Sequence, residues 1–245
     1  MEFLVNTFNL ILYQPLFNAL ILLYEYFPGR DFGLAVIVLT ILIKAVLYPL
    51  GAQAIRAQKN LAQLQPKVEA LQKKYKNDKE KLVKETLELY KREKINPFSG
   101  FLPLLVQLPI LIAIYQVFWR GFGAEQMALL YGFVPRPERF DTTFFGALDL
   151  ASPNFFLAVF AGITQFFQTK MITPQTGSGQ ALSKGTDFSK MMQKQILYFL
   201  PALTVLILWK LPSAIGLYWV VTSLFTIFQQ YLISKPRDTT SSQLS

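Results

Sequence analysis

The chain has 245 residues, of which 52% are hydrophobic and 16% charged, and its formal net charge is +9. An ordinary soluble domain carries about 25% charged residues, so this chain is unusually apolar. It contains neither Cys nor His. That composition excludes disulfides, a Ser-His-Asp triad and the HExxH metalloprotease motif, and we expect no enzymatic activity, cofactor or metal site.

Charged residues are distributed very unevenly along the chain. They crowd into residues 56–94 and nearly disappear elsewhere, which is typical of apolar membrane spans joined by wet loops. A hydrocarbon core of about 30 Å needs about 20 residues of helix. We therefore predict an all-α, polytopic membrane protein. Its five spans are expected near residues 33–54, 98–119, 153–172, 192–210 and 214–233.

The charge of the loops predicts their orientation. Segment 56–97 carries 12 Lys/Arg against 6 Asp/Glu, whereas segment 120–152 carries 3 against 4. Because basic loops stay in the cytoplasm, segment 56–97 is expected inside and the 120–152 loop outside. The 173–190 loop and a short tail, residues 235–245, then also face the cytoplasm.

Residues 1–29 have two interpretations. Polar residues fall on one helical face before Pro15 and on another after it; these are Glu2, Asn6 and Asn9, then Gln14, Asn18 and Glu25. This pattern favours a kinked amphipathic helix on the outer membrane face, followed by the five-span core at 30–234. A sixth span or an uncleaved signal anchor is the alternative. The segment has no basic n-region and no A-x-A site, so we do not expect a cleaved signal.

Segment 56–97 is expected to form an antiparallel helical hairpin. Apolar residues recur at helical spacing in two stripes; these are Leu61, Leu64, Val68, Leu71 and Tyr75, then Leu82, Val83, Leu87 and Tyr90. Asn77 with Glu80 indicates an N-cap for the second helix, and Pro66 should kink or restart the first. Such a hairpin would project from the membrane and offer a docking surface.

Lys44 is the one charged residue of the first predicted span. Counted from Gly33 at 1.5 Å per residue, it lies about 16 Å deep, near the middle of the bilayer. A lysine there costs about 2.5–3.5 kcal/mol on insertion scales. The five predicted spans contain no Asp or Glu. Lys44 is therefore expected to face water, polar side chains or an acidic group of a substrate.

Polar residues occur at matching depths on the other spans. With Thr40, one turn above Lys44, they are Gln107, Thr164, Gln165, Thr204, Thr222, Ser223 and Thr226. A hydrated groove in the inner half of the bilayer would account for all of them. Two simpler explanations remain open. Such residues often bond between helices as packing contacts, and Lys44 could extend its ammonium group toward the inner surface.

Several short motifs occur together along most of the chain. They are YPL at the end of the first span, LQPK, LYK-x-EK-x-NP, PLL-x-Q-x-PI, LPSAIGLYW and TIFQQYLI. With this combination the sequence resembles the YidC-type membrane protein insertases of the Oxa superfamily, from about Phe8 to Ile233. The resemblance implies a five-span insertase core in the bacterial inner membrane. It also implies a positively charged groove that is open to the cytoplasm and lipid and closed to the outside.

The resemblance suggests roles for individual residues. Lys44 stands where the family has an arginine; it keeps the charge but loses the bidentate fork. Lys44 would attract a polar, often acidic, segment of a nascent membrane protein into the groove. Tyr218 and Trp219 would guide the apolar part of the substrate, although aromatic packing is an equally good explanation for both.

The expected partners are nascent membrane proteins and the lipid bilayer, with the ribosome, the signal recognition machinery and a Sec-type translocon as further candidates; no nucleic-acid sequence is expected to be read. The alternative function is a small-solute transporter or channel. Such a protein would be expected to carry intramembrane carboxylates or an inverted repeat, and the sequence shows neither. A membrane-embedded hydrolase is disfavoured by the absence of His and Cys.

Overall fold

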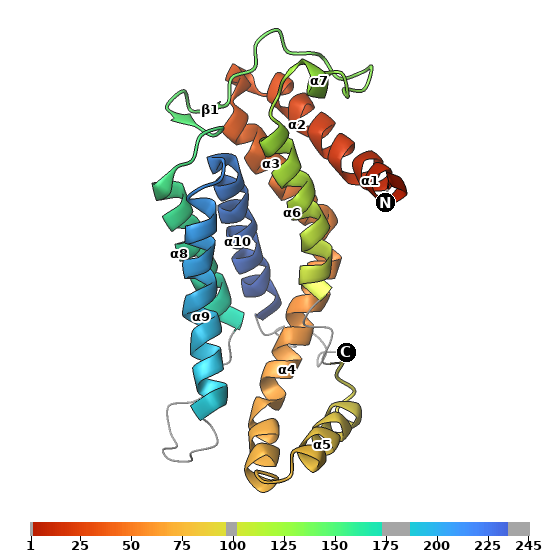
Figure 1. Cartoon of the computed structure of the whole chain (residues 1–245), viewed down its shortest axis with the longest axis vertical. Helices are drawn as coiled ribbons and strands as arrows, with labels where there is room; N and C mark the ends of the chain where they lie inside the picture. The colour runs from red at the N-terminus through yellow and green to blue at the C-terminus, as the bar shows by residue number, and fades with distance from the viewer. Residues whose placement is uncertain (1, 97–101, 173–186, 235–245) are drawn as a thin grey trace, which may run out of the picture.

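The computed structural model describes residues 2–96, 102–172 and 187–234, and helices form nearly all of their regular structure (Figure 1). The helices are α1 (Glu2–Phe8), α2 (Gln14–Tyr26), α3 (Phe32–Val46), α4 (Tyr48–Lys74), α5 (Lys79–Arg92), α6 (Leu102–Arg120), α7 (Ala124–Met127), α8 (Phe155–Ile172), α9 (Asp187–Leu208) and α10 (Ser213–Ser234). A π-helical turn, η1 (Asn9–Tyr13), joins α1 to α2, and a 3-10 turn, η2 (Pro28–Arg30), precedes α3. Strands β1 (Thr143–Phe144) and β2 (Leu148–Asp149) pair antiparallel. The predicted helical class is confirmed.

Helices α3, α6, α8, α9 and α10 run side by side as a bundle (Figure 1). Helix α10 is the central element, because it packs against α3, α4, α6, α8 and α9. The α4–α5 hairpin lies at one end of the bundle, here called the hairpin end. Strand β1 and helix α7 lie at the other, here called the loop end.

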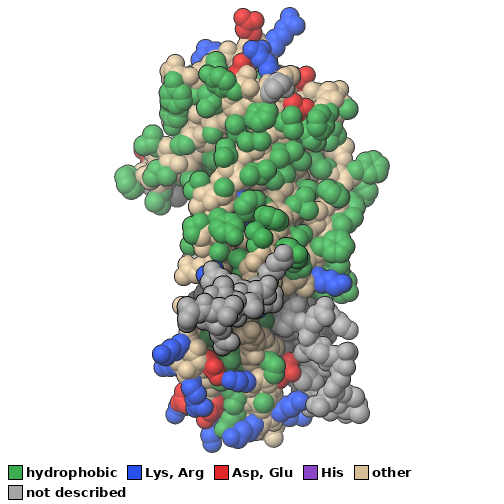
Figure 2. Space-filling view, turned by 180° about the vertical axis from the view of Figure 1, so that it is seen from behind, with side chains coloured by type: hydrophobic (Ala, Val, Ile, Leu, Met, Phe, Trp, Pro, Cys, Tyr) green, Lys and Arg blue, Asp and Glu red, His purple; other side chains and the backbone are tan. Residues whose placement is uncertain are grey.

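On the face shown in Figure 2, exposed apolar side chains form a broad band over the bundle, and charged side chains gather at its two ends. Helix α8 illustrates the pattern, because Ala158 and Ala161 are buried. Its opposite face exposes large apolar residues at helical spacing; these are Phe156, Phe160, Ile163 and Phe167. A continuous apolar surface of this kind is what a helix presents to lipid.

Length and apolar composition single out few helices as spans. Of the described residues, only the continuous helix Glu2–Tyr26 is long and apolar enough to cross a membrane alone, and α3 with α4 passes if the bent pair counts as one span. Helix α3 has only 15 residues, and α10 carries polar residues such as Thr222 and Gln229. The predicted number of five spans is therefore not confirmed by this criterion.

The predicted span 33–54 is not one straight helix. Helix α3 ends at Val46, Leu47 leaves helical geometry, and α4 continues at an angle of 67° to α3. Pro49, in the first turn of α4, occupies a position where its missing N–H costs no helical hydrogen bond. The YPL motif thus marks a bend, and the helix after it extends to Lys74.

Helices α4 and α5 occupy the segment in which the hairpin was predicted, and they differ from the prediction in two details. The N-cap of α5 is Asp78 and not Asn77, because the Asp78 carboxylate accepts a 3.0 Å hydrogen bond from the Lys81 N–H. Helix α4 is also continuous through Pro66, so of the two expectations, a kink or a restart, the restart is wrong. Lys67 and Glu93 form an ion pair that joins the base of the hairpin.

Polar side chains on one face of the N-terminal helix form hydrogen bonds with the 120–152 loop. Asn18 is only 3% exposed, and its amide donates to the Leu129 carbonyl at 3.1 Å and accepts from the Tyr131 N–H at 2.6 Å. Gln14 donates to the same Leu129 carbonyl at 3.0 Å. Part of the polar face that suggested a surface-lying helix is thus satisfied by the 120–152 loop, and the choice between a surface helix and a span stays a prediction.

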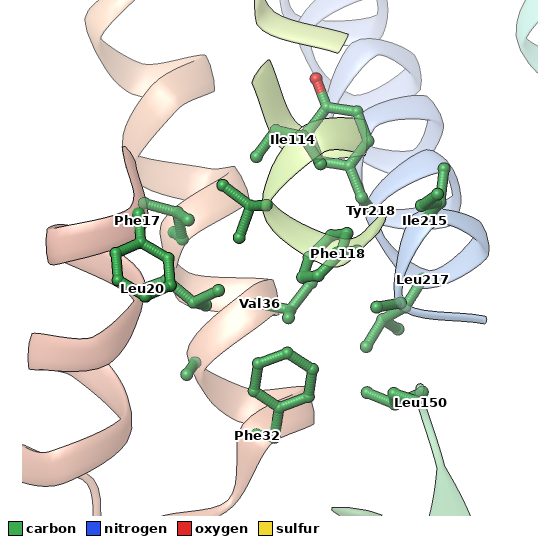
Figure 3. Close-up of a cluster of buried hydrophobic side chains, with 14 of the residues drawn as sticks. Phe17, Leu20, Phe32, Val36, Ile114, Phe118, Leu150, Ile215, Leu217 and Tyr218 are labelled. Carbon is green, nitrogen blue, oxygen red and sulfur yellow. The ribbon is translucent and has the colours of Figure 1, made fainter. Parts of the chain in front are cut away.

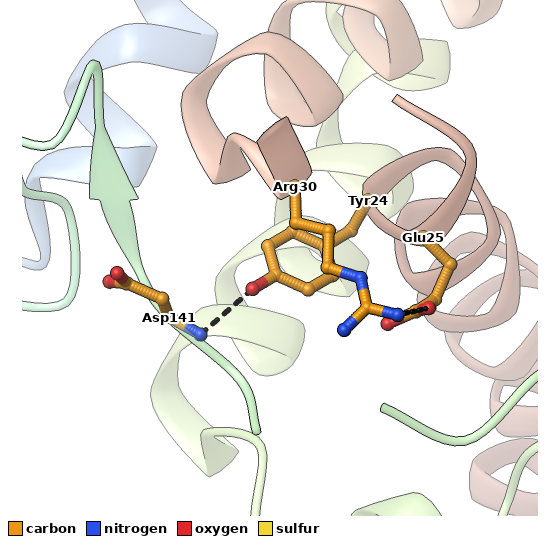
Figure 4. A network of polar contacts seen from close by, with 4 residues as sticks. All are labelled: Tyr24, Glu25, Arg30 and Asp141. Carbon is orange, nitrogen blue, oxygen red and sulfur yellow. Dashed lines mark hydrogen bonds and ion pairs between the residues drawn. The ribbon is translucent and has the colours of Figure 1, made fainter. Parts of the chain in front are cut away.

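Two further contacts fasten this helix at the loop end (Figure 4). The Asp141 N–H donates to the Tyr24 hydroxyl at 3.0 Å, and Arg30 pairs with Glu25 at 2.9 Å. On the neighbouring helix α3, the ring of Phe144 lies so close to Gly33 that a Cβ there would clash with it. The loop is thus held on both α2 and α3.

Asp149 connects the β1–β2 turn to the start of α10. Its carboxylate accepts hydrogen bonds from the Ser152 hydroxyl at 2.6 Å, the Thr142 hydroxyl at 2.7 Å and the Ala151 N–H at 2.9 Å. Its backbone carbonyl accepts one from the Ser213 hydroxyl at 3.1 Å. The Ser152, Thr142 and Ala151 donors together hold the pKa of the Asp149 carboxyl below its usual value.

We expect Asp149→Ala to lower the melting temperature of the detergent-solubilised protein at pH 7 by about 2–4 °C, the shift that about 1 kcal/mol produces in a chain of this size. Because the folded-state pKa is depressed, this stabilisation is present above the unfolded pKa of about 3.9 and is lost as the pH falls through the folded value. Thermal melts at several pH values measure it. Glu138→Ala is the control, since Glu138 is an exposed loop carboxylate; equal shifts in both variants would contradict the prediction.

Candidate substrate groove

A cavity of about 400 Å³ lies inside the bundle on the hairpin side. Five bundle helices and the start of α4 contribute to its wall. Its polar lining residues are Lys44, Gln58, Gln107, Gln165, Gln168, Thr169, Tyr218, Trp219, Thr222, Ser223, Thr226, Gln229 and Gln230. The bend at Leu47 makes this possible, because it turns α4 so that Gly51 and Gln58 face α10.

Eight of the eleven residues singled out from the sequence line this cavity. They are Lys44, Gln107, Gln165, Tyr218, Trp219, Thr222, Ser223 and Thr226. Thr40 does not: it is 1% exposed, and its hydroxyl donates to the Val36 carbonyl at 2.6 Å within its own helix. Thr164 similarly donates to the Ala161 carbonyl at 2.9 Å. The packing explanation therefore fits Thr40, whereas Thr164 lines a neighbouring cavity.

Five polar lining residues were missed in the sequence; they are Gln58, Gln168, Thr169, Gln229 and Gln230. A signal for some of them was present. Thr222, Thr226 and Gln229 follow i, i+4, i+7 spacing on one face of α10, and Gln168 lies three residues after Gln165 on α8. Gln58 had no such signal, because it lies in a segment expected outside the membrane.

Hydrogen bonds fix part of the lining. Gln107 of α6 donates to the Tyr218 hydroxyl, and the Trp219 indole donates to Gln165 of α8 at 3.2 Å. Gln229 donates to the Tyr48 carbonyl at 2.8 Å, which ties α10 to the bend between α3 and α4. These bonds join α10 to three other helices around the cavity.

Other buried polar groups at the cavity have no protein partner among the described residues. They are both polar atoms of the Gln230 amide. Gln230 is only 3% exposed. Buried polar atoms are normally paired with protein or water, so this lining is suited to water or to a polar ligand.

Lys44 supplies the charge of the cavity. It is half-buried, and within the described part of the chain it forms no ion pair. No Asp or Glu is among the residues that line the cavity. The cavity therefore carries an uncompensated positive charge, which attracts anionic groups most strongly where little water screens it.

Apolar packing closes the bundle on the loop side of the cavity (Figure 3). Residues of α3, α6, α10 and the loop meet there; they include Phe32, Val36, Ile114, Phe118, Leu150, Ile215 and Leu217. Tyr218 lies at the boundary, because its ring belongs to this cluster and its hydroxyl bonds to Gln107. It is 1% exposed, so it forms part of the deep end of the cavity, next to the apolar packing on the loop side.

A second, larger cavity of about 810 Å³ adjoins the first between α4, α8 and α10. Ile55, Gln58 and Gln230 line both. The space thus continues from Lys44 toward the hairpin end, where Lys59 and Lys170 line it. Among the described residues, no cluster of three His, Cys, Asp or Glu side chains is suited to bind a metal ion.

Comparison with known proteins identifies the family. Residues 22–240 match the family described as 60Kd inner membrane protein. The chain is 34% identical over 224 residues to the membrane protein insertase YidC of Syntrophus aciditrophicus, covering 91% of this chain and 36% of that protein. It is 33% identical over 205 residues to the membrane protein insertase YidC of Francisella tularensis subsp. novicida, covering 84% of this chain and 33% of that protein.

The chain thus spans about a third of the length of the curated relatives that it matches. The match includes the bend, the hairpin and all the helices that line the cavity. The chain belongs to the 60Kd inner membrane protein family, whose members include bacterial insertases of the YidC type.

Proposed function

We propose that this protein inserts nascent membrane proteins into the bacterial inner membrane through the cavity around Lys44. One observation carries the proposal: a polar, positively charged cavity lined by no described carboxylate lies within an apolar bundle and is blocked by apolar packing on the loop side. Relatives named as insertases support the same function. No bond is made or broken in the process, so the protein needs no catalytic residue.

The cavity would lower the main cost of insertion. A polar group without a hydrogen-bond partner costs about 2–7 kcal/mol in an apolar medium. Thr222, Gln230 and Lys44 offer such a group partners inside the bundle. A polar segment of the substrate would enter from the hairpin end and cross only the remaining apolar part. Partition of the substrate's hydrophobic helix into lipid would then drive the step.

We place the five helices α3, α6, α8, α9 and α10 across the membrane, with the hairpin in the cytoplasm and the 120–152 loop outside. The exposed apolar band and the surplus of Lys and Arg in the hairpin support this topology. The N-terminal helix would lie obliquely at the outer side, since it is fastened to the loop and runs at a slant to α6 (Figure 1). The hairpin would bind partners such as the ribosome, the signal recognition machinery or a Sec-type translocon.

The topology is testable because the chain contains no cysteine. Lys79 and Asp141 are both exposed, so single Lys79→Cys and Asp141→Cys variants are expected to fold. In intact cells, a membrane-impermeant thiol reagent should label position 141 and leave position 79 unlabelled until the cells are opened. Labelling of position 79 in intact cells would reverse the proposed orientation.

The function is tested with the purified full chain in proteoliposomes. We expect it to insert a single-span test protein, measured by protease protection, and to leave the uptake of small solutes and ions at the level of empty liposomes. Proteoliposomes containing an unrelated polytopic protein control for leakage. Solute uptake without insertion would favour the transporter or channel instead.

A further inference from the structure

The larger cavity has the two properties that an amphiphile requires. Its wall is largely apolar, with Ile55, Phe167 and Leu224 facing it from three different helices. Lys59 of α4 and Lys170 of α8 add two cationic side chains at the hairpin end. A volume of about 810 Å³ is within the range of pockets that bind small organic ligands, about 300–1,000 Å³.

No described carboxylate balances the charges of this cavity. Its lining contains two lysines and no Asp or Glu, and neither lysine belongs to an ion pair within the described residues. Both lysines are exposed on their helices, so their ammonium groups can reach an anion at the mouth of the cavity. This is the opposite of a solvated helix face, where Lys is normally interleaved with acidic residues.

Gln230 provides an independent indication of a ligand. Its side chain is 3% exposed and lines both cavities, and neither its Oε1 nor its Nε2 has a hydrogen-bond partner in the described structure. Burying an amide without hydrogen-bond partners costs free energy unless another molecule forms hydrogen bonds with it. Its position between the apolar wall and Lys44 calls for a ligand with a polar group next to an apolar one.

We propose that the cavity binds one anionic phospholipid of the adjacent leaflet. Its phosphate lies between Lys59 and Lys170, its ester region bonds to Gln230, and an acyl chain packs against Ile55, Phe167 and Leu224. Because Gln230 also lines the Lys44 cavity, the bound lipid occupies the passage between that cavity and the hairpin end. An entering polypeptide segment must displace it. The site itself is independent of whether the chain acts as an insertase.

Native mass spectrometry of the full chain in detergent tests the site. The protein is titrated with phosphatidylglycerol or with phosphatidylcholine of the same acyl chains. We expect phosphatidylglycerol to bind at least about tenfold more tightly, and Lys59→Gln/Lys170→Gln to remove most of that preference, since the two lysines favour a headgroup with a net negative charge over a zwitterionic one. The control is Lys79→Gln/Lys84→Gln on the exposed hairpin, which removes the same charge elsewhere.

A second variant separates shape from charge. Ala62 lines the cavity, and Ala62→Phe should weaken phosphatidylglycerol binding about tenfold or more by filling the space while both lysines remain. Glycerol phosphate, which has no acyl chains, should not compete. Equal binding of the two lipids, an equal loss in the hairpin control, or undiminished binding by Ala62→Phe would each overturn the proposal. Insertion activity is not the readout, so failure here leaves the proposed function standing.

Discussion

Lys44→Ala is expected to reduce the insertion of a substrate with an acidic translocated segment about tenfold, which corresponds to about 1.4 kcal/mol of lost attraction. The expected order is Arg ≈ Lys > Ala > Glu at position 44, because the cavity needs a positive charge and a glutamate would repel the segment. The fold should persist in Lys44→Ala, since an unpaired charge is removed and none is created. Among the described residues, no carboxylate forms an ion pair with Lys44, so the substitution leaves no carboxylate unpaired.

The measurement compares an acidic test substrate with a version whose acidic residues are changed to Asn and Gln, at matched protein levels. Insertion efficiency should differ strongly among the four residues at position 44 for the acidic substrate and hardly at all for the neutral one. Thr40→Val is a matched control, because Thr40 lies one turn away on the same helix but bonds only within it. If all four residues at position 44 insert the acidic substrate equally, the charge of the cavity has no role in insertion.

Removal of the hairpin should also reduce insertion activity about tenfold or more, while the bundle remains folded. Helix α5 has no buried residue, so little packing is lost with it. The Lys67–Glu93 ion pair brings the two arms of the helical hairpin together at its base. Residues 68–92 can therefore be replaced by a short Gly/Ser linker. Val83 and Leu87 are exposed large apolar residues on α5, and they are the natural candidates for partner contact.

Two measurements decide this prediction. Thermal stability in detergent should change little, and insertion in proteoliposomes and in cells should both fall. Val83→Ser/Leu87→Ser, which leaves the hairpin in place, should reproduce part of the loss if these residues bind a partner. A deletion variant with full insertion activity would show that the hairpin is dispensable.

Much of the helical architecture could be predicted because apolar segments and charge clusters are local features of sequence. The helices after residue 98 begin and end near their predicted positions. The N-cap of α5 was misplaced by one residue, at Asn77 instead of Asp78, because both side chains can accept a capping hydrogen bond. The span predicted at 33–54 contains a bend at Leu47, which an uninterrupted apolar pattern does not indicate.

By itself, the sequence determined that the chain is helical, strongly apolar, free of Cys and His, and equipped with one lysine in an otherwise uncharged segment. It also determined how deep each polar residue lies along its helix, because the rise per residue is fixed. Only the tertiary structure decided which of those residues share a cavity. Depth does not specify the direction in which a side chain points, since helix rotation is set by packing against neighbours. Thr40 therefore forms its hydrogen bond within its own helix. The bend at Leu47, in contrast, brings Gln58, from outside the predicted spans, into the same cavity as Lys44.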